Sequence, residues 1–126
     1  MSDGVLDSSA VLALLFAEPG SDKVKAFLPG GLLSTVNLTE VVSKLRERGM
    51  PSEAVFTAIE ALGVEIVDFD FVQAAGAAEL RLTTRHLGLS LGDRACLALA
   101  HVRRLPVVTA DSAWAGVPDC DVRTIR

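Results

Sequence analysis

The chain has 126 residues, of which 50% are hydrophobic and 22% are charged. This composition excludes a disordered chain, and the length suits one domain over residues 1–126 and is too short for two ordinary ones. No apolar run approaches the about 20 residues of a membrane-spanning helix, and the first residues lack the basic segment of a signal peptide. We therefore expect a single cytoplasmic domain without membrane association.

The net charge is −4 at pH 7, which is unusual for a protein that binds nucleic acid, because phosphate binding generally needs a basic surplus. An acidic balance is compatible with that function when carboxylates are grouped to hold cations. The chain contains only three lysines, all within its first 44 residues. Its two cysteines, Cys96 and Cys120, have no metal-ligand spacing, so we expect reduced thiols.

Apolar spacing and turn residues predict short strands that alternate with helices. The strands are expected at residues 5–6, 32–35, 64–67, 106–109 and 122–125. The helices are expected at residues 8–17, 21–28, about 36–48, 51–62, 71–86 and 93–104, with one helical turn at 111–115. This alternation predicts an α/β fold, a three-layer α/β/α sandwich with a mainly parallel central sheet.

Four acidic residues fall where such a fold binds ligands. Asp7 and Asp111 follow predicted strands, and Glu40 and Asp93 lie in the first turns of predicted helices. Ligands bind outside the carboxyl ends of parallel strands, and grouped carboxylates need a compensating cation. A hard divalent ion, Mg²⁺ or Mn²⁺, matches oxygen ligands and would suit the hydrolysis of a phosphodiester.

Each acid also has a purely structural explanation. Asp7, Asp93 and Asp111 precede predicted helices, where a carboxylate accepts hydrogen bonds from free backbone N–H groups. Glu40 stands three residues after Asn37, which is the spacing of a variant capping box. The sequence alone leaves both explanations open for each residue.

Four segments resemble those of PIN domains, in the same order along nearly the whole chain. VLDSSA at residues 5–10 is similar to the family's first strand and acid, and STVNLTEV at residues 34–41 resembles its second-acid helix. LSLGDRACLALA at residues 89–100 resembles the third-acid helix, and VVTADSAW at residues 107–114 resembles the last strand with its Thr-x-Asp motif and following aromatic residue.

The resemblance implies an endoribonuclease that depends on Mg²⁺ or Mn²⁺. The catalytic and metal-binding residues it implies are Asp7, Glu40, Asp93 and Asp111. Ser9 and Thr109 would be supporting hydroxyls. The length resembles that of VapC-type toxins of toxin–antitoxin systems, so an antitoxin protein and a homodimer are expected as partners, with RNA as the substrate.

Several arginines are candidates for RNA contacts. Arg94 directly follows the third acid, where small residues are common in the family, and Arg81 and Arg85 lie near the end of a predicted helix. They would attract phosphate groups, although cations at helix ends also commonly just face solvent. His86 and His101 lack ligand spacing and are expected at the surface.

The mean hydropathy of +0.41 indicates more apolar surface than a small core needs. Phe16, Phe27 and Phe56 are the candidates for an antitoxin groove or for self-association, with burial in the core as the alternative.

Other functions fit the sequence less well. A receiver domain needs a lysine near its late strands, and none follows Lys44; an aspartyl phosphatase needs a second aspartate where Ser9 stands. A catalytically silent PIN-like binding module remains the main alternative to the nuclease.

Overall fold

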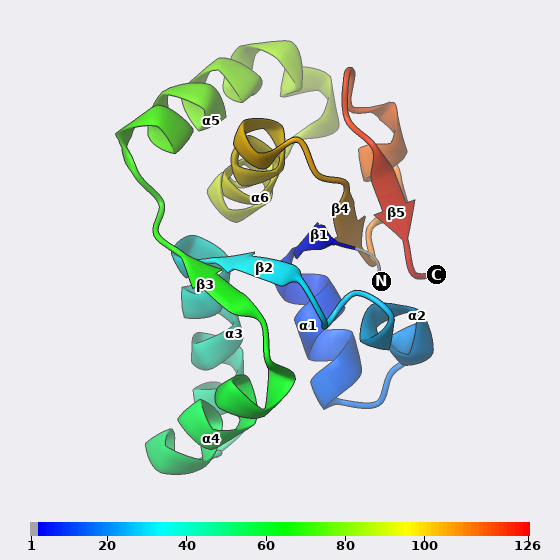
Figure 1. Cartoon of the computed structure of the whole chain (residues 1–126). Coiled ribbons are helices and arrows are strands. Elements are labelled where there is room, and N and C mark those ends of the chain that lie inside the picture. Colours follow the sequence, from blue (N-terminus) through cyan, green and yellow to red (C-terminus); the bar gives the residue numbers. More distant parts are fainter. Residues whose placement is uncertain (1–2) are drawn as a thin grey trace.

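A parallel sheet forms the centre of the molecule in the computed structural model, which describes residues 3–126. Its strands are β1 (Gly4–Leu6), β2 (Gly31–Ser34), β3 (Glu65–Val67), β4 (Val107–Thr109) and β5 (Val122–Thr124). Their order is β3-β2-β1-β4-β5, and every pairing is parallel (Figure 1). The predicted sheet is confirmed.

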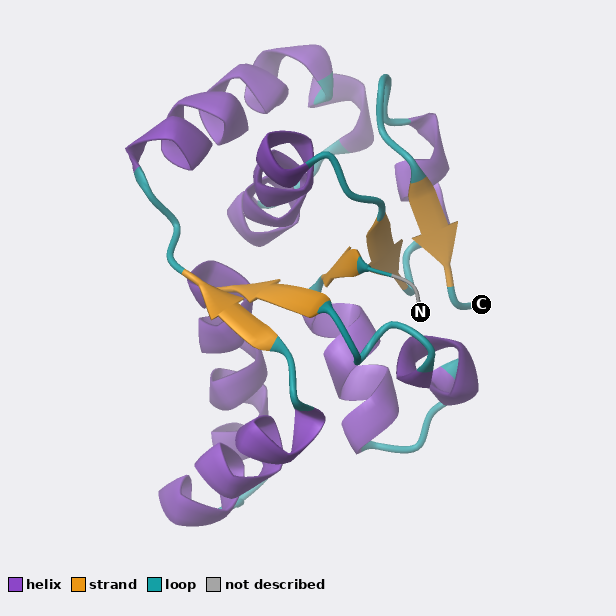
Figure 2. Ribbon diagram, in the orientation of Figure 1, coloured by secondary structure: helices purple, strands orange, loops and turns teal. Residues whose placement is uncertain are grey.

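Helices cover both faces of the sheet, as the predicted three-layer sandwich requires (Figure 2). On one face lie α1 (Ser8–Leu15), α2 (Ser21–Lys25), α3 (Thr35–Glu47) and α4 (Ser52–Leu62). On the other face lie α5 (Phe71–Thr83) and α6 (Leu91–Arg103). Two short 3-10 helices are also present: η1 (Arg85–Leu87) before α6 and η2 (Ser112–Gly116) before β5. No helix within residues 3–126 has the length and apolar character needed to cross a membrane.

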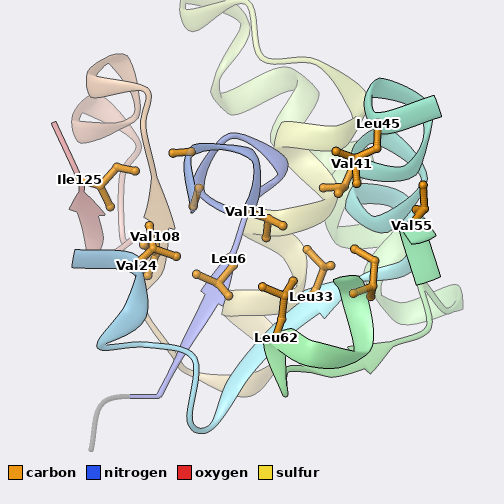
Figure 3. Close-up of a cluster of buried hydrophobic side chains, with 13 residues drawn as sticks. Leu6, Val11, Val24, Leu33, Val41, Leu45, Val55, Leu62, Val108 and Ile125 are labelled. Carbon is orange, nitrogen blue, oxygen red and sulfur yellow. The ribbon is translucent and has the colours of Figure 1, made fainter. Parts of the chain in front are cut away.

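The core has two halves because successive residues of a strand point to opposite faces of the sheet. Leu6, Leu33 and Val108 pack with the helices of the α1–α4 side (Figure 3). The adjacent strand residues point the other way and pack with α6 and Trp114; these residues are Val5, Leu32 and Val107. Short strands that alternate in this way are buried on both faces, which explains their continuous apolar runs.

The parallel arrangement brings the ends of different strands to the same edge of the sheet. Asp7 follows β1 directly, Ser34 ends β2, and Asp111 lies just beyond β4. Helices α1 and α3 begin at this edge, so their free backbone N–H groups also lie there. The fold therefore provides a polar edge suited to ligands.

Several predicted helix ends differ from those observed. The helix expected from Asp93 begins at Leu91, because Ser90 is its N-terminal cap and forms a capping box with Asp93. The capping box predicted for Asn37 and Glu40 is wrong, since Ser34 caps α3 and Glu40 lies in its second turn. The helix predicted to reach residue 86 ends at residue 83 and is followed by η1.

Truncating the buried Leu6 side chain in the central strand β1 should greatly reduce the stability of the fold. Leu6 is fully buried, so Leu6→Ala should lower the free energy of unfolding by about 2–5 kcal/mol. Leu82→Ala on α5, where the side chain is 61% exposed, should change it by less than about 0.5 kcal/mol. Urea unfolding followed by the fluorescence of Trp114, the only tryptophan, measures both. Equal effects of the two substitutions would contradict this packing.

Candidate active site

Asp7 lies at the centre of a hydrogen-bond network at the carboxyl edge of the sheet. Its Oδ1 accepts hydrogen bonds from the Ala10 backbone N–H at 2.8 Å and from Ser9 Oγ at 2.7 Å. Its Oδ2 accepts one from Thr109 Oγ1 at 2.6 Å. Asp7 is only 4% exposed, so these bonds replace most of its contact with water. The two hydroxyls expected to support the site both contact this carboxylate.

The environment of Asp7 disfavours its ionised form. Its pKa is raised from 3.8 to about 6, with burial as the largest cause; the hydrogen bonds from Thr109, Ala10 and Ser9 lower it, and the charge of Asp93 adds a smaller rise. No lysine or arginine within the described part of the chain forms an ion pair with Asp7. A buried carboxylate without a cationic partner is costly, and a bound cation would remove that cost.

The same network extends to the end of β4. The backbone N–H of Ala110 donates to Ser9 Oγ at 3.0 Å, and that of Asp111 donates to Thr109 Oγ1 at 3.0 Å. The Asp111 side chain is exposed and accepts a hydrogen bond from the Ala113 N–H at 2.9 Å. Asp111 is therefore joined to Asp7 through Thr109, while its own carboxylate caps η2.

Glu40 belongs to a second group of contacts, between α3 and α6. Asn37 Nδ2 donates to Glu40 Oε1 at 2.9 Å and to the carbonyl oxygen of Gly92 at 3.0 Å. A side chain at Gly92 would force the Glu40 carboxylate to move, because a Cβ there would lie 2.6 Å from Glu40 Cδ. The sequence did not predict Asn37 or Gly92 as site components, since the spacing of Asn37 indicated only a cap.

Asp93 follows Gly92 in the first turn of α6. Its Oδ2 accepts a hydrogen bond from the Ser90 N–H at 2.9 Å, and its N–H donates to Ser90 Oγ at 3.1 Å. This capping box fixes the first turn, and it places Asp93 close enough to Asp7 to affect the pKa of Asp7.

The thiol of Cys96 shows that three acids surround the same region. Burial raises its pKa well above the usual range, and the charges of Asp7, Cys120, Asp93 and Glu40 raise it further. Nevertheless, in residues 3–126 no three Asp, Glu, His or Cys side chains are arranged closely enough to ligate one metal ion in these conformations. The structure thus places Asp7, Glu40 and Asp93 near Cys96 without arranging them as a ligand set, and it leaves the Asp111 side chain exposed.

The residues present fit a hard divalent cation. The donors are carboxylate oxygens, which Mg²⁺ and Mn²⁺ prefer, and none of the four acids forms an ion pair within the described residues. Asn37 Oδ1 is buried without a hydrogen-bond partner and adds one more unsatisfied oxygen to this region. Asp7, Glu40, Asp93 and Asp111 are the residues that would hold such an ion.

The remaining candidates lie around this region or away from it. Arg81 and Arg85 are exposed, and they line a small pocket together with the half-buried Arg94. His86 and His101 are exposed, as expected. A larger cavity of about 690 Å³ lies between α5, α6 and the loop before β5, and its lining includes His101 and Cys120 but none of the four acids.

The three phenylalanines considered as partner contacts differ in burial. Phe16 and Phe27 are partly buried against the core, and Phe16 also packs under the guanidinium of Arg48 at 4.3 Å. Phe56 on α4 is 52% exposed. Of the three, only Phe56 presents a largely open apolar surface.

Comparison with known proteins identifies relatives of this fold. Residues 4–119 match the family model described as PIN domain. No curated protein sequence matches the chain significantly. A chain in a toxin–antitoxin complex from Klebsiella pneumoniae shares the fold with a TM-score of 0.78 and 21% identity, over 98% of each chain.

Two further structures extend this likeness. DNA-bound VapBC from Salmonella typhimurium matches with a TM-score of 0.77 and 17% identity, over 100% of each chain. VapC20 of Mycobacterium tuberculosis, a toxin that cleaves the sarcin–ricin loop, matches with a TM-score of 0.72 and 15% identity, over 97% of this chain and 99% of that one. At these identities the likeness establishes the fold.

The raised pKa of Asp7 predicts how its substitution affects stability in EDTA. Between about pH 3.8 and pH 6 the Asp7 carboxyl is protonated in the folded chain and ionised in the unfolded chain. Protonation keeps the cost of burying Asp7 low at acidic pH, and this advantage of the folded state is lost as the pH rises through about 6. The gain in unfolding free energy from Asp7→Asn should therefore be larger at about pH 7.5 than at about pH 5, by about 1.4 kcal/mol. Urea unfolding at both pH values measures it, and an identical gain at both would contradict the assigned environment.

Proposed function

The chain belongs to the PIN domain family, and from this premise we propose that it is a metal-dependent endoribonuclease that hydrolyses RNA phosphodiester bonds. The proposed catalytic and metal-binding residues are Asp7, Glu40, Asp93 and Asp111. We propose further that the chain is the toxin of a toxin–antitoxin pair. The observation that carries the proposal is the buried carboxylate of Asp7, which has another acid nearby and no cationic side chain to pair with.

The residues that contact the four acids have defined roles in this proposal. Ser9 and Thr109 hold the two oxygens of Asp7 in one orientation, and Thr109 also fixes the backbone of Asp111. Asn37 orients Glu40 toward the first turn of α6. When bound, Mg²⁺ or Mn²⁺ would supply the positive charge that activates water and stabilises the charge developing on the phosphodiester. The protein contributes a preorganised set of oxygen donors, which lowers the cost of arranging them.

A protein partner is part of the proposal. The related structures from Klebsiella pneumoniae and Salmonella typhimurium are complexes of toxins with antitoxins. This chain exposes large apolar side chains that an antitoxin or a second copy would cover, among them Phe56 and Phe71, which is 85% exposed. We therefore propose an antitoxin protein as partner and a homodimer as the assembly.

A catalytically silent PIN-like module is the alternative, and the capping bonds are the observation in its favour. Asp7, Asp93 and Asp111 each satisfy backbone N–H groups at a helix start, as purely structural acids would. Capping, however, does not explain why Asp7 is buried beside another acid. The two functions differ in metal binding and in RNA cleavage.

Substitution of Asp93 tests the nuclease directly. Asp93→Asn keeps an oxygen that can accept the Ser90 N–H, so the fold should persist, while metal-dependent cleavage of a mixed structured-RNA pool should fall by more than about 100-fold. The assay compares Mg²⁺, Mn²⁺ and EDTA. Asp70→Asn is the matched control, because Asp70 makes a similar capping bond at the start of α5, is not one of the four acids and should leave cleavage unchanged.

Two outcomes would count against the proposal. Equal cleavage by the wild type and Asp93→Asn would show that the assigned residues do not carry the activity. No cleavage with either metal, together with no Mn²⁺ binding by calorimetry, would leave the acids as helix caps and favour the silent module.

Gly92 offers a second test that separates activity from stability. In Gly92→Ala the new Cβ would displace the Glu40 carboxylate, which is the flexible end of a side chain, so metal-dependent cleavage should fall at least about tenfold, as when a residue that orients a metal ligand is removed. Stability should stay level or rise by up to about 1 kcal/mol, because alanine favours helices. The control is Gly76→Ala in α5, where the nearest atom would be Ala98 Cβ at 3.7 Å. Unchanged cleavage by Gly92→Ala would contradict the placement of Glu40.

A further inference from the structure

Three arginines line a small pocket near the start of α6, the helix that carries Asp93. Arg81 comes from the last turn of α5, Arg85 from η1 and Arg94 from the first turn of α6. The pocket has a volume of about 120 Å³ and its wall includes Thr84 and Leu89. Since water occupies about 30 Å³ in the liquid, this space holds a group the size of a phosphate together with a few waters.

These arginines have no acidic partner among residues 3–126. Every ion pair formed by an arginine there involves Arg103, Arg123 or Arg126. Three like charges around one pocket repel each other, and the repulsion is relieved when an anion enters. The pocket is thus a local concentration of positive charge on a chain whose net charge is −4.

The position of Arg94 is not explained by helix electrostatics. Cations at the C-terminal ends of helices are stabilised by the helix dipole, which accounts for Arg81 and, less directly, Arg85. Arg94 instead lies at the start of α6, the end at which the dipole favours anions. The helix dipole therefore does not account for Arg94.

The side chain of Arg94 is anchored but incompletely satisfied. One of its terminal nitrogens, Nη1, donates to the carbonyl oxygen of Ala77 on α5 at 3.0 Å, which holds the guanidinium against that helix. Its Nε is buried and has no hydrogen-bond partner. A buried N–H without an acceptor is costly, so the protein alone does not fully satisfy this guanidinium.

We propose that this pocket binds a backbone phosphate of the RNA substrate, at a linkage other than the one hydrolysed; this rests on the function proposed above. Guanidinium groups match phosphate oxygens in a planar, two-pronged geometry. Arg94 directly follows Asp93, so the pocket and the acidic site share the first turn of α6. The pocket positions the strand and offsets the repulsion between the acids and the RNA.

A phosphate of RNA fits these observations better than a carboxylate of a protein partner. Without bound cations the acids repel RNA phosphates, and the rest of the chain carries no basic surplus to compensate. An RNA substrate therefore needs cationic groups next to the acids, where this pocket lies. An acidic peptide need not approach the four acids, so its binding does not require cationic groups next to them.

Binding measured in EDTA tests the pocket without any cleavage. The probe is a fluorescein-labelled single-stranded RNA of mixed sequence, and its anisotropy is followed at several salt concentrations. Arg81→Gln/Arg85→Gln and, separately, Arg94→Lys should each weaken binding by about tenfold. In the double variant the slope of log K against log salt should also fall by about 0.7, the value expected when the protein neutralises one phosphate fewer on a single strand.

Arg103→Gln is the matched control, because it removes the same charge from the far end of α6, where Arg103 pairs with Glu65 at 3.6 Å. It should leave RNA affinity within about twofold of the wild type. Urea unfolding checks that Arg94→Lys remains folded, and in the metal-loaded enzyme Arg81→Gln/Arg85→Gln should raise KM more than it lowers kcat.

The inference would be overturned by equal weakening in the pocket variants and in Arg103→Gln, which would indicate general charge attraction. It would also be overturned by unchanged RNA affinity in the pocket variants, including the case in which an acidic peptide binds the wild-type pocket instead. These outcomes do not depend on catalysis. The nuclease can therefore be confirmed through Asp93→Asn while the pocket fails, and the pocket can bind RNA while cleavage fails.

Discussion

The burial of Asp7 is the constraint on which the candidate site depends. The residue ends the central strand of the sheet, so its carboxylate must lie among the ends of β1 and β4 and the start of α1. The protein provides hydrogen bonds from Ser9, Ala10 and Thr109 for it, and yet its pKa is raised to about 6. Hydrogen bonds satisfy the oxygens of a carboxylate, but they do not balance its charge in a buried position. The network therefore orients the group without neutralising it, which is the arrangement that a cation site requires.

The first turn of α6 is the second element on which the site depends. Ser90 fixes where the helix begins, and this sets the direction in which Gly92, Asp93 and Arg94 project. Gly92 allows Glu40 to approach, Asp93 faces the region of Asp7, and Arg94 turns toward α5. A shift of the helix start by one residue would rotate all three by about 100°. One cap therefore sets an acidic side and a cationic side on the same turn.

The sequence predicted the fold well because its signals are local. Apolar runs, glycines and prolines marked every strand, and the ends of the strands located Asp7 and Asp111. The contacts of Asn37 could not be predicted in the same way, since its partner Gly92 is 55 residues away. The spacing of Asn37 and Glu40 was compatible with a cap, and only the position of Ser34 shows that it is not one. Likewise, the pocket of Arg81, Arg85 and Arg94 depends on how α5 packs against α6, which no local pattern reveals.

The hydrogen bonds of the acids also bear on how folding relates to metal binding. In a structural zinc site the ligands are unsatisfied without the ion, so folding and binding are one event. Here Asp7, Asp93 and Asp111 already accept hydrogen bonds from backbone N–H groups. We therefore expect the chain to fold before any ion binds, and an ion that binds the folded form would add stability according to its concentration and affinity. The acids consequently serve two purposes with the same oxygens: they begin the helices of the fold, and they leave a charge that the folded chain does not balance by itself.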